Sequence, residues 1–433
     1  MNCTSPVAAL RRAKARMAGA RGLEKAGGTV KCPGMTDVPA SFDVAVVGGG
    51  PAGLSAAIAL AQAGASTVLM ARRAPYADNR TTALLGGSVA FLDGLGVWQD
   101  CRDKAAGLKT MRLVDDTGRL IRAPEVRFTA AEIELDVFGY NIENRTLVAA
   151  LEQRAAACPG LTRIAEDAET VVSDPDAVTI TTVSGQSVTA QLAVGADGRH
   201  SLCREAAGIS VRRRELGQTA LTFNITHARP HHGASTEFHT PHGPCVFVPL
   251  PGDRSSVVWV AAPKEAERTF ALDDEALSAA AEKQSHSILG RVHVEPGRHM
   301  FPLSIERPHR YADRRIALVG EAAHVVPPIG AQGLNLGLRD AMDIADIVGK
   351  AMTAGEDVGA PLVLTRYAAA RRADILSRTF VIDIANRSLL SEFLPMQSLR
   401  AAGMHMIGAI GPLRRLAMRE GLAPSWRSNR RAS

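Results

Sequence analysis

Residues 42–70, FDVAVVGGGPAGLSAAIALAQAGASTVLM, decide the fold of this chain. The largely apolar run Phe42–Val47 predicts a parallel strand that is buried on both faces. The spacing Gly48-x-Gly50-x-x-Gly53 follows directly, and after it come an alanine-rich helix and a second apolar strand. Glycines at these positions let the backbone approach a pyrophosphate group at the start of the helix. This order of strand, glycine turn, helix and strand predicts a dinucleotide-binding unit.

The same region contains 28 consecutive uncharged residues, Val44–Ala71, a length that could also span a bilayer. A transmembrane helix gives no reason for glycines at the positions of the dinucleotide fingerprint. We therefore favour the folded unit over a membrane span.

The end of the second strand departs from the usual pattern of this unit. An acidic residue normally stands there and holds the ribose hydroxyls of the nucleotide. This chain has Met70-Ala71-Arg72-Arg73 instead. Either other residues hold the adenosine end, or Arg72 and Arg73 accept a 2′-phosphate as in NADP.

A second motif, VGADGRHS over residues 194–201, follows a strand that we expect over Gln191–Val194. The carboxylate of Asp197 can accept hydrogen bonds from the hydroxyls of a ligand or from backbone N–H groups. A plain Asp-Gly turn is the alternative, and we favour a ligand contact.

A third motif occupies residues 317–341, ALVGEAAHVVPPIGAQGLNLGLRDA. An apolar strand leads into Gly320 and Glu321, and Pro327 and Pro328 stiffen the following loop. A glycine-rich turn then opens a helix, whose first N–H groups point outward and favour negative charge. The candidate residues at this helix start are Gly330, Gly333, Leu334 and Asn335.

In this order, the three motifs resemble those of the single-component FAD aromatic hydroxylases, the class A flavoprotein monooxygenases with the para-hydroxybenzoate hydroxylase fold. GAQGLNLGLRD and YNIEN, residues 140–144, are most similar to the ubiquinone-biosynthesis hydroxylases. The resemblance covers roughly residues 36–425. It implies tightly bound FAD, NAD(P)H as a transient reductant, and O₂ that hydroxylates the ring of a polyprenylated phenol.

The resemblance also implies roles for individual residues. FAD contacts fall on the glycines of the first motif, on Asp197, on Gly320 and the helix start after it, and on Glu321, where relatives usually have aspartate. Weaker matches place Arg80 and Asn144 beside FAD. The alternatives are a surface charge for Arg80 and a helix N-cap for Asn144, ahead of a helix over Arg145–Arg154.

The loop of the third motif is expected to face the substrate. The carbonyl of Pro327 or Pro328 could lie on the substrate side of the flavin. His324 is either a structural residue or a catalytic base, and we favour the structural role because no partner carboxylate can be read from the sequence.

The middle of the chain has the pattern of antiparallel strands. Hairpins are expected over Lys109–Phe128, turning at residues 116–118, and over Val178–Val194; strands are expected over Gln218–Ile225 and Cys245–Ala261. We predict an α/β fold in which a Rossmann-like FAD-binding domain is interleaved with a mostly antiparallel β-sheet substrate domain, followed by C-terminal helices. The expected divisions are a disordered basic extension (1–35), FAD-binding parts (36–112, 140–207 and 301–365), substrate-domain parts (113–139 and 208–300) and a helical region (366–433).

Charge is unevenly distributed along the 433 residues, whose net charge is +6. Residues 1–34 carry seven basic residues and one acid, and residues 366–433 carry twelve arginines and four acids, so the middle carries about −8. A nucleic-acid partner is not expected, because such proteins place basic residues on the folded body.

Cysteine and histidine spacing predicts no metal site. The six cysteines include no CxxC pair, which fits a reducing compartment. The histidines of the middle region match no closed ligand set and are read as a polar loop: His227, His231, His232, His239 and His242.

Both ends of the chain remain open to several interpretations. Residues 1–34 are a disordered tail, an organelle presequence or an extension upstream of a natural start at Met35, and we favour the last. The apolar, arginine-rich stretch Ser388–Met418 either lies on a membrane surface, contacts other ubiquinone-biosynthesis enzymes or packs on the protein itself. We expect a cytoplasmic protein peripheral on the inner leaflet, or on the matrix side of a mitochondrial membrane if the chain is eukaryotic.

The expected activity is hydroxylation of a polyprenylated phenol in ubiquinone biosynthesis. A hydroxylase of a small soluble phenol is a second possibility, and a flavoprotein halogenase is disfavoured because no tryptophan pair accompanies the motifs. A non-catalytic flavin-fold scaffold of a lipid-synthesis complex is the alternative from another class, because Ala71 and Glu321 both depart from the pattern.

Overall fold

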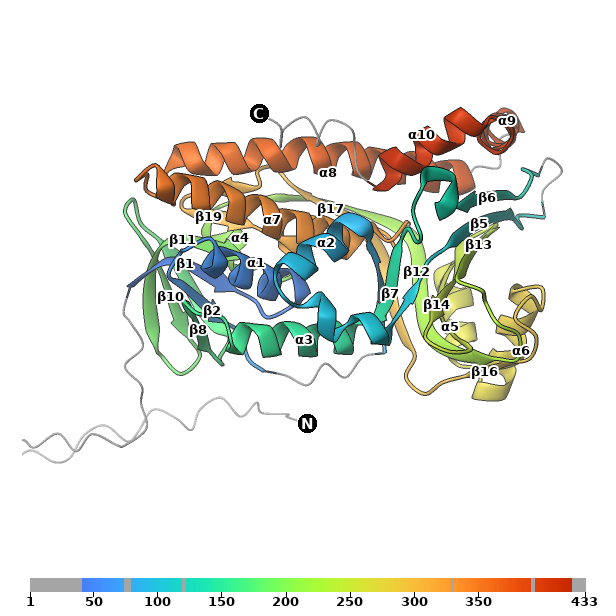
Figure 1. The fold of residues 1–433 in the computed structure, drawn as a ribbon, viewed down its shortest axis with the longest axis horizontal. Helices are drawn as coiled ribbons and strands as arrows, with labels where there is room; N and C mark the ends of the chain where they lie inside the picture. The colour runs from blue at the N-terminus through green and yellow to red at the C-terminus, as the bar shows by residue number, and fades with distance from the viewer. Residues whose placement is uncertain (1–40, 74–78, 119–121, 329, 391–393, 423–433) are drawn as a thin grey trace, which may run out of the picture. The chain divides into compact units, whose positions relative to one another are not determined.

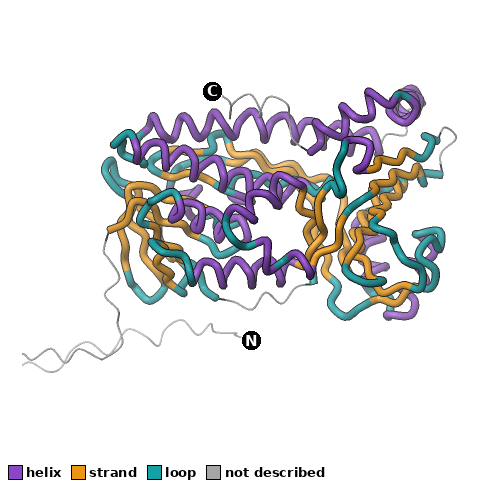
Figure 2. The backbone as a smooth tube through the Cα atoms, in the orientation of Figure 1, coloured by secondary structure: helices purple, strands orange, loops and turns teal. Residues whose placement is uncertain are grey.

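The structure, a computed structural model, describes residues 41–73, 79–118, 122–328, 330–390 and 394–422. The predictions for residues 1–34 lie outside this range. Two large sheets and a small one make up the described part, with helices packed along them (Figures 1 and 2).

The first large sheet is built on the dinucleotide-binding unit that the glycine spacing predicted. Its spatial order is β18 (Ala312–Asp313), β19 (Ile316–Leu318), β11 (Ser187–Gly195), β1 (Ser41–Val47), β2 (Thr67–Met70) and β8 (Leu161–Ile164), with β9 (Ala168–Ser173) and β10 (Val178–Thr182) attached to β11. The strands from β19 to β8 run parallel. All four residues of β2 are buried, as expected of a strand covered on both faces.

Helix α1 (Pro51–Gln62) packs on α3 (Asn144–Ala156) and on α7 (Gln332–Thr353), and α7 packs on α8 (Pro361–Leu390) (Figure 1). Contacts on two sides explain why α1 has an apolar residue at nearly every position. The stretch Val44–Ala71 is therefore a strand, a helix and a strand. Among the described residues, no helix has the length and apolar character needed to cross a membrane.

The second large sheet is antiparallel apart from one pair. Its order is β16 (Val292–Val294), β12 (Val211–His227), β15 (Arg254–Ala261), β14 (Gly243–Leu250), β13 (Ala234–Thr240), β5 (Thr110–Asp115) and β6 (Val126–Thr129), and β17 (His299–Pro308) also pairs with β12. Helices α5 (Pro263–Phe270) and α6 (Asp274–Gln284) pack along it. Phe223, Phe238 and Phe247 form the centre of its core.

A three-stranded sheet stands between the two large ones (Figure 1). It contains β3 (Thr81–Leu85), β7 (Gly139–Glu143) and β4 (Ala105–Gly107), and α2 (Gly86–Gly94) continues from β3. The buried Asn141 side chain of β7 donates to the carbonyl of Pro249 at 2.9 Å. This bond ties the small sheet to the second large sheet.

The hairpin around residues 116–118 is wider than predicted. Strands β5 and β6 do pair, but residues 116–125 separate them. The carboxylate of Asp115 accepts hydrogen bonds from the Thr117 hydroxyl at 2.6 Å and the Ala123 N–H at 2.8 Å. These bonds hold the chain in a broad loop instead of a tight turn.

The C-terminal helices α9 (Leu394–Ala409) and α10 (Gly411–Leu422) each have a proline, Pro395 and Pro412, at their second residue. Part of this region packs on the protein. Met418 is buried against Ile133 and Phe138, and Arg414 pairs with Glu132 at 2.7 Å.

Candidate flavin and substrate site

The turn between β1 and α1 is closed on its protein side and open on the other. A Cβ atom on Gly48 would lie 2.2 Å from the carbonyl oxygen of Ala196, and one on Gly53 would lie 2.1 Å from the carbonyl oxygen of Gly48. Only glycine fits these two positions. At Gly50, no heavy atom of the described residues lies within 4 Å of a Cβ position. The turn therefore leaves space for a ligand beside Gly50, as the fingerprint requires.

The start of α7 is fastened to β3 by the side chain of Asn335. Its amide N–H groups donate to the carbonyls of Ala83 at 2.8 Å and Ala331 at 2.6 Å, and its oxygen accepts from the N–H of Leu85 at 2.9 Å. Asn335 is buried and fixes the direction of the helix start.

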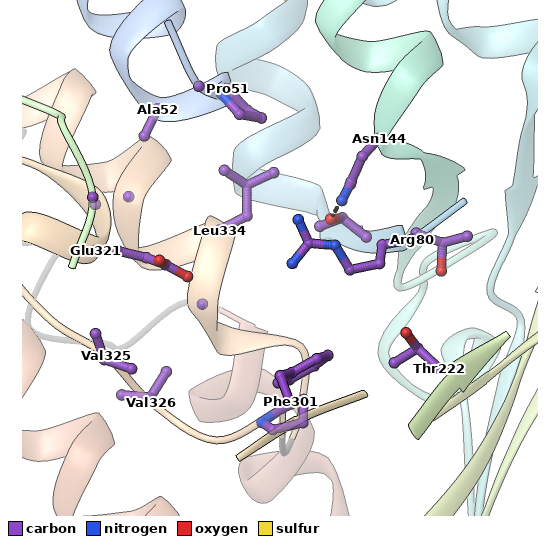
Figure 3. Close-up of a pocket in the computed structure, with 18 of the residues that line it drawn as sticks. Pro51, Ala52, Arg80, Asn144, Thr222, Phe301, Glu321, Val325, Val326 and Leu334 are labelled. Atoms are coloured by element: carbon purple, nitrogen blue, oxygen red, sulfur yellow. Dashed lines mark hydrogen bonds between the residues drawn. The ribbon is translucent and has the colours of Figure 1, made fainter. Parts of the chain in front are cut away.

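A cavity of about 420 Å³ lies where the starts of α1 and α7 meet the second large sheet (Figure 3). Two helix starts with outward N–H groups suit a ligand with negative charge at both places. The predicted site residues that line it are Gly50, Gly53, Arg80, Asn144, Gly320, Glu321, His324, Pro328, Gly333 and Leu334; those outside its lining are Gly48, Asp197, Pro327, Gly330 and Asn335.

Beneath the cavity lies a buried charge network that sequence reasoning missed. Asp340 on α7 is fully buried and accepts from the N–H of Gly320 at 2.9 Å and from Arg371 of α8 at 2.6 Å. Burial raises the pKa of Asp340, but the charges of Arg371 and His324 outweigh burial and lower this pKa to about 2. The sequence did contain an indication of this network. Asp340 stands four residues from both Leu336 and Ile344, which places an acid on the apolar face of α7.

The partner of His324 is Asp340, which the sequence could not identify. Nε2 of His324 and Oδ2 of Asp340 are 2.7 Å apart, and both side chains are buried. Within the described part of the chain, Nδ1 of His324 has no hydrogen-bond partner. His324 thus connects the lining of the cavity to the buried network.

Asp197 and Glu321 are engaged differently. Asp197 accepts from the Ser201 hydroxyl at 2.6 Å and the Cys203 N–H at 3.1 Å, so it stabilises its own turn. The Glu321 side chain is 61% exposed and lies 3.5 Å from Arg199, a partner that the sequence did not reveal. Glu321 therefore reaches the cavity from its solvent side (Figure 3).

The N-cap interpretation of Asn144 is wrong. Glu143 is the N-cap residue of α3, and Asn144 is the first residue of the helix. Its side-chain oxygen accepts from the Thr82 hydroxyl at 2.6 Å, and its N–H donates to the carbonyl of Arg80 at 2.9 Å. Asn144 and Arg80 therefore lie together on one side of the cavity (Figure 3).

The histidines of the middle region make hydrogen bonds within the protein. His227 contacts the carbonyl of Arg229 at 2.9 Å and the hydroxyl of Ser255 at 3.0 Å, and His239 pairs with Glu237 at 3.0 Å. Among the described residues, no cluster of three or more side chains has the make-up of a metal site.

Known proteins share the fold of this chain, and a family model covers most of its length. The FAD binding domain family matches residues 41–375. The solved p-nitrophenol 4-monooxygenase of Pseudomonas putida shares the fold, with a TM-score of 0.73, 20% identity, and coverage of 88% of this chain and 98% of that one. The fold and site define a flavoprotein aromatic monooxygenase.

Two bacterial proteins are similar to this chain over nearly their whole length. The chain is 36% identical over 387 residues to the ubiquinone hydroxylase UbiL of Rhodospirillum rubrum, covering 88% of this chain and 89% of that protein. It is 30% identical over 401 residues to the 3-demethoxyubiquinol 3-hydroxylase of Escherichia coli, covering 90% and 100%. The chain therefore belongs to the FAD binding domain family.

The residues present fit FAD. Gly50 and Gly333 each leave open space at a helix start, because no heavy atom of the described residues lies within 4 Å of their Cβ positions. The pyrophosphate fits the start of α1, and the flavin ring fits the start of α7 beside Leu334.

Proposed function

We propose that this protein hydroxylates the aromatic ring of a polyprenylated phenol in ubiquinone biosynthesis, using NAD(P)H and O₂. The observation that carries the proposal is the cavity shared by the flavin-binding helix starts and the second large sheet. The two relatives described above, whose names refer to ubiquinone and demethoxyubiquinol, support the substrate class.

FAD held at these two helix starts would supply the redox chemistry that couples NAD(P)H oxidation to O₂, with one oxygen atom entering the ring and the other leaving as water. The protein supplies position, electrostatics and exclusion of water. The N–H groups at the start of α7 would stabilise negative charge on a bound flavin. Pro328 lines the cavity and Pro327 is buried behind it, so this rigid loop limits how substrate and flavin approach.

We assign to His324 a positioning role. Its hydrogen bond to Asp340, together with the bond from Gly320 to the same carboxylate, holds the turn that carries Glu321. A general base would need an open path to the substrate proton. His324 is only 3% exposed, which supports the structural role.

The second sheet supplies the substrate side of the cavity. Thr222 of β12 is 9% exposed and lines the cavity, yet among the described residues its hydroxyl has no hydrogen-bond partner. A buried hydroxyl without a partner is costly. Thr222 therefore suits the phenol oxygen, and Phe301 of β17 offers an apolar surface to the ring (Figure 3).

The prenyl tail needs an apolar path to a membrane, and we place the membrane-facing surface on α9 and α10. Met406, Ile410 and Leu416 are 50%, 44% and 57% exposed there, although Met418 of the same region is buried. One side of these helices packs on the protein while another presents apolar side chains among arginines. The same surface could also receive other enzymes of the pathway.

The test uses the purified holoenzyme, NAD(P)H and isotopically labelled O₂, with a phenol that carries a prenyl chain and the same phenol without it. We expect one labelled oxygen atom in the product and faster NAD(P)H consumption with the prenylated phenol. Equal or better turnover of the unprenylated phenol would favour the small-phenol hydroxylase. Bound FAD that NAD(P)H never reduces would favour the scaffold.

A further inference from the structure

A partly buried ion pair lies beside the strand end where the usual acid is missing. Ala71 follows β2, is 4% exposed and packs against the glycine turn, since its Cβ lies 2.9 Å from a Cβ position on Gly49. The guanidinium of Arg163, from the neighbouring strand β8, comes within 3.7 Å of that same position. Arg163 therefore stands at the adenosine end of the nucleotide cleft, beyond the flavin cavity.

Among the described residues, one nitrogen of this guanidinium has a hydrogen-bond partner. Nη2 of Arg163 donates to Glu152 of α3 at 2.7 Å, and the Arg163 side chain is 10% exposed. Across the described residues, Nε and Nη1 of Arg163 have no hydrogen-bond partner although both are buried. Buried donors without acceptors destabilise the free protein, and a ligand that supplies acceptors removes that cost.

We propose that Glu152 and Arg163 together hold the ribose hydroxyls of the adenosine half of FAD, in place of the absent strand-end acid. The N–H groups of Arg163 that lack partners among the described residues donate to the hydroxyl oxygens, and Glu152, whose side chain is 26% exposed, accepts from them. A donor and an acceptor side by side match a pair of vicinal hydroxyls.

A 2′-phosphate fits this place less well. The carboxylate of Glu152 repels an anion, and Arg72, one of the two arginines expected to attract one, already pairs with Asp167 at 3.3 Å and is 75% exposed. Burial, followed by the nearby charge of Arg73, lowers the pKa of Arg163, so the guanidinium depends on Glu152 for compensation.

The test measures the dissociation constants of FAD and of its 2′-deoxyadenosine analogue for the apoprotein, by quenching of flavin fluorescence. Wild type should bind FAD about tenfold more tightly than the analogue, the size expected of one hydrogen bond to a charged group. Arg163→Met should weaken FAD binding at least tenfold and reduce this preference to about one, because the donors are gone. Glu152→Gln should also reduce the preference.

Two further variants separate ribose recognition from a general loss of structure. Arg127→Met, the same change at an arginine that is 62% exposed on the second sheet, should leave both constants unchanged. Adding Ala71→Glu to Arg163→Met restores the usual acid and should recover most of the FAD affinity. If Arg163→Met weakens FAD and the deoxy analogue equally, Arg163 contacts the pyrophosphate or only supports the fold, and the assignment is wrong. If a 2′-phosphorylated adenosine nucleotide competes better than its unphosphorylated form, the site selects a phosphate and the assignment is also wrong.

Discussion

The two ends of the FAD site are built in opposite ways. At the flavin end, the buried Asp340 accepts from Gly320, His324 and Arg371, all within hydrogen-bond distance. At the adenosine end, Arg163 keeps two buried N–H groups that no described residue accepts. The Asp340 carboxylate at the flavin end is therefore paired before the cofactor binds, whereas the Arg163 guanidinium at the adenosine end gains partners from the cofactor. Folding stability should depend on the buried network around Asp340 at the flavin end. Discrimination between FAD and its analogues should depend on Arg163 at the adenosine end.

The largest effect is expected from breaking the flavin end. Asp340→Asn leaves Arg371, which is fully buried, without one of its charged partners. Removing one member of a buried ion pair costs about 3–5 kcal/mol of folding stability. Urea unfolding followed by circular dichroism measures this loss. Asp346→Asn, on the exposed side of the same helix, should change stability by less than about 0.5 kcal/mol; a comparable loss in both variants would contradict the account.

Low pH should reduce the loss of folding stability that Asp340→Asn causes. The pKa of Asp340 in the folded protein is about 2, below its ordinary value of 3.8. A lowered pKa gives stability that is present above the ordinary value and is lost as pH falls toward the folded one. The gap between wild type and Asp340→Asn in free energy of unfolding should therefore be constant above about pH 5 and shrink on going down to about pH 2. A gap that widens on acidification would show that the carboxylate is not held as its anion.

A smaller effect on activity is expected on the substrate side of the cavity. Thr222 resembles Arg163 in having a buried polar group with no hydrogen-bond partner among the described residues. Thr222→Val removes the hydroxyl and keeps the shape. KM for the prenylated phenol should rise about three- to tenfold, the value of one hydrogen bond, while the dissociation constant of FAD stays unchanged. Thr226→Val, at an exposed position of the same strand, is the matched control. Unchanged KM in both variants would remove Thr222 from the substrate site.

The smallest effect is expected at Glu321. The resemblance implied an aspartate there, but the Glu321 side chain is 61% exposed and lies at the edge of the cavity. Glu321→Asp should alter the dissociation constant of FAD by less than about threefold, since exposed charges contribute little. A change of a hundredfold or more in a flavin titration would move Glu321 from the edge of the site to its centre.

Local spacing was enough to predict one part of the molecule. The glycines at 48, 50 and 53 fix the β1–α1–β2 unit because the turn leaves no room for side chains at two of these positions. The hairpin expected over Val178–Val194 was equally predictable, since a short turn between alternating runs defines a hairpin.

Long-range partners could not be predicted in the same way. Strand β5 pairs in parallel with β13, more than a hundred residues later, and Arg371 meets Asp340 only because α8 packs on α7. The sequence did not predict a role for Arg163 either, because that role depends on the fold bringing Ala71 and Glu152 beside it. Tertiary packing decides which buried charges pair with each other. The spacing of residues along the chain therefore cannot predict these pairs.

The most direct test of the account is the absorption spectrum of the purified protein, titrated with FAD and then followed without oxygen as NAD(P)H is added. The account predicts a yellow protein with one FAD per chain, whose colour bleaches faster when a prenylated phenol is present. A colourless protein that cannot be reconstituted with FAD would contradict it, because neither end of the site would then hold the cofactor that this fold is built to bind.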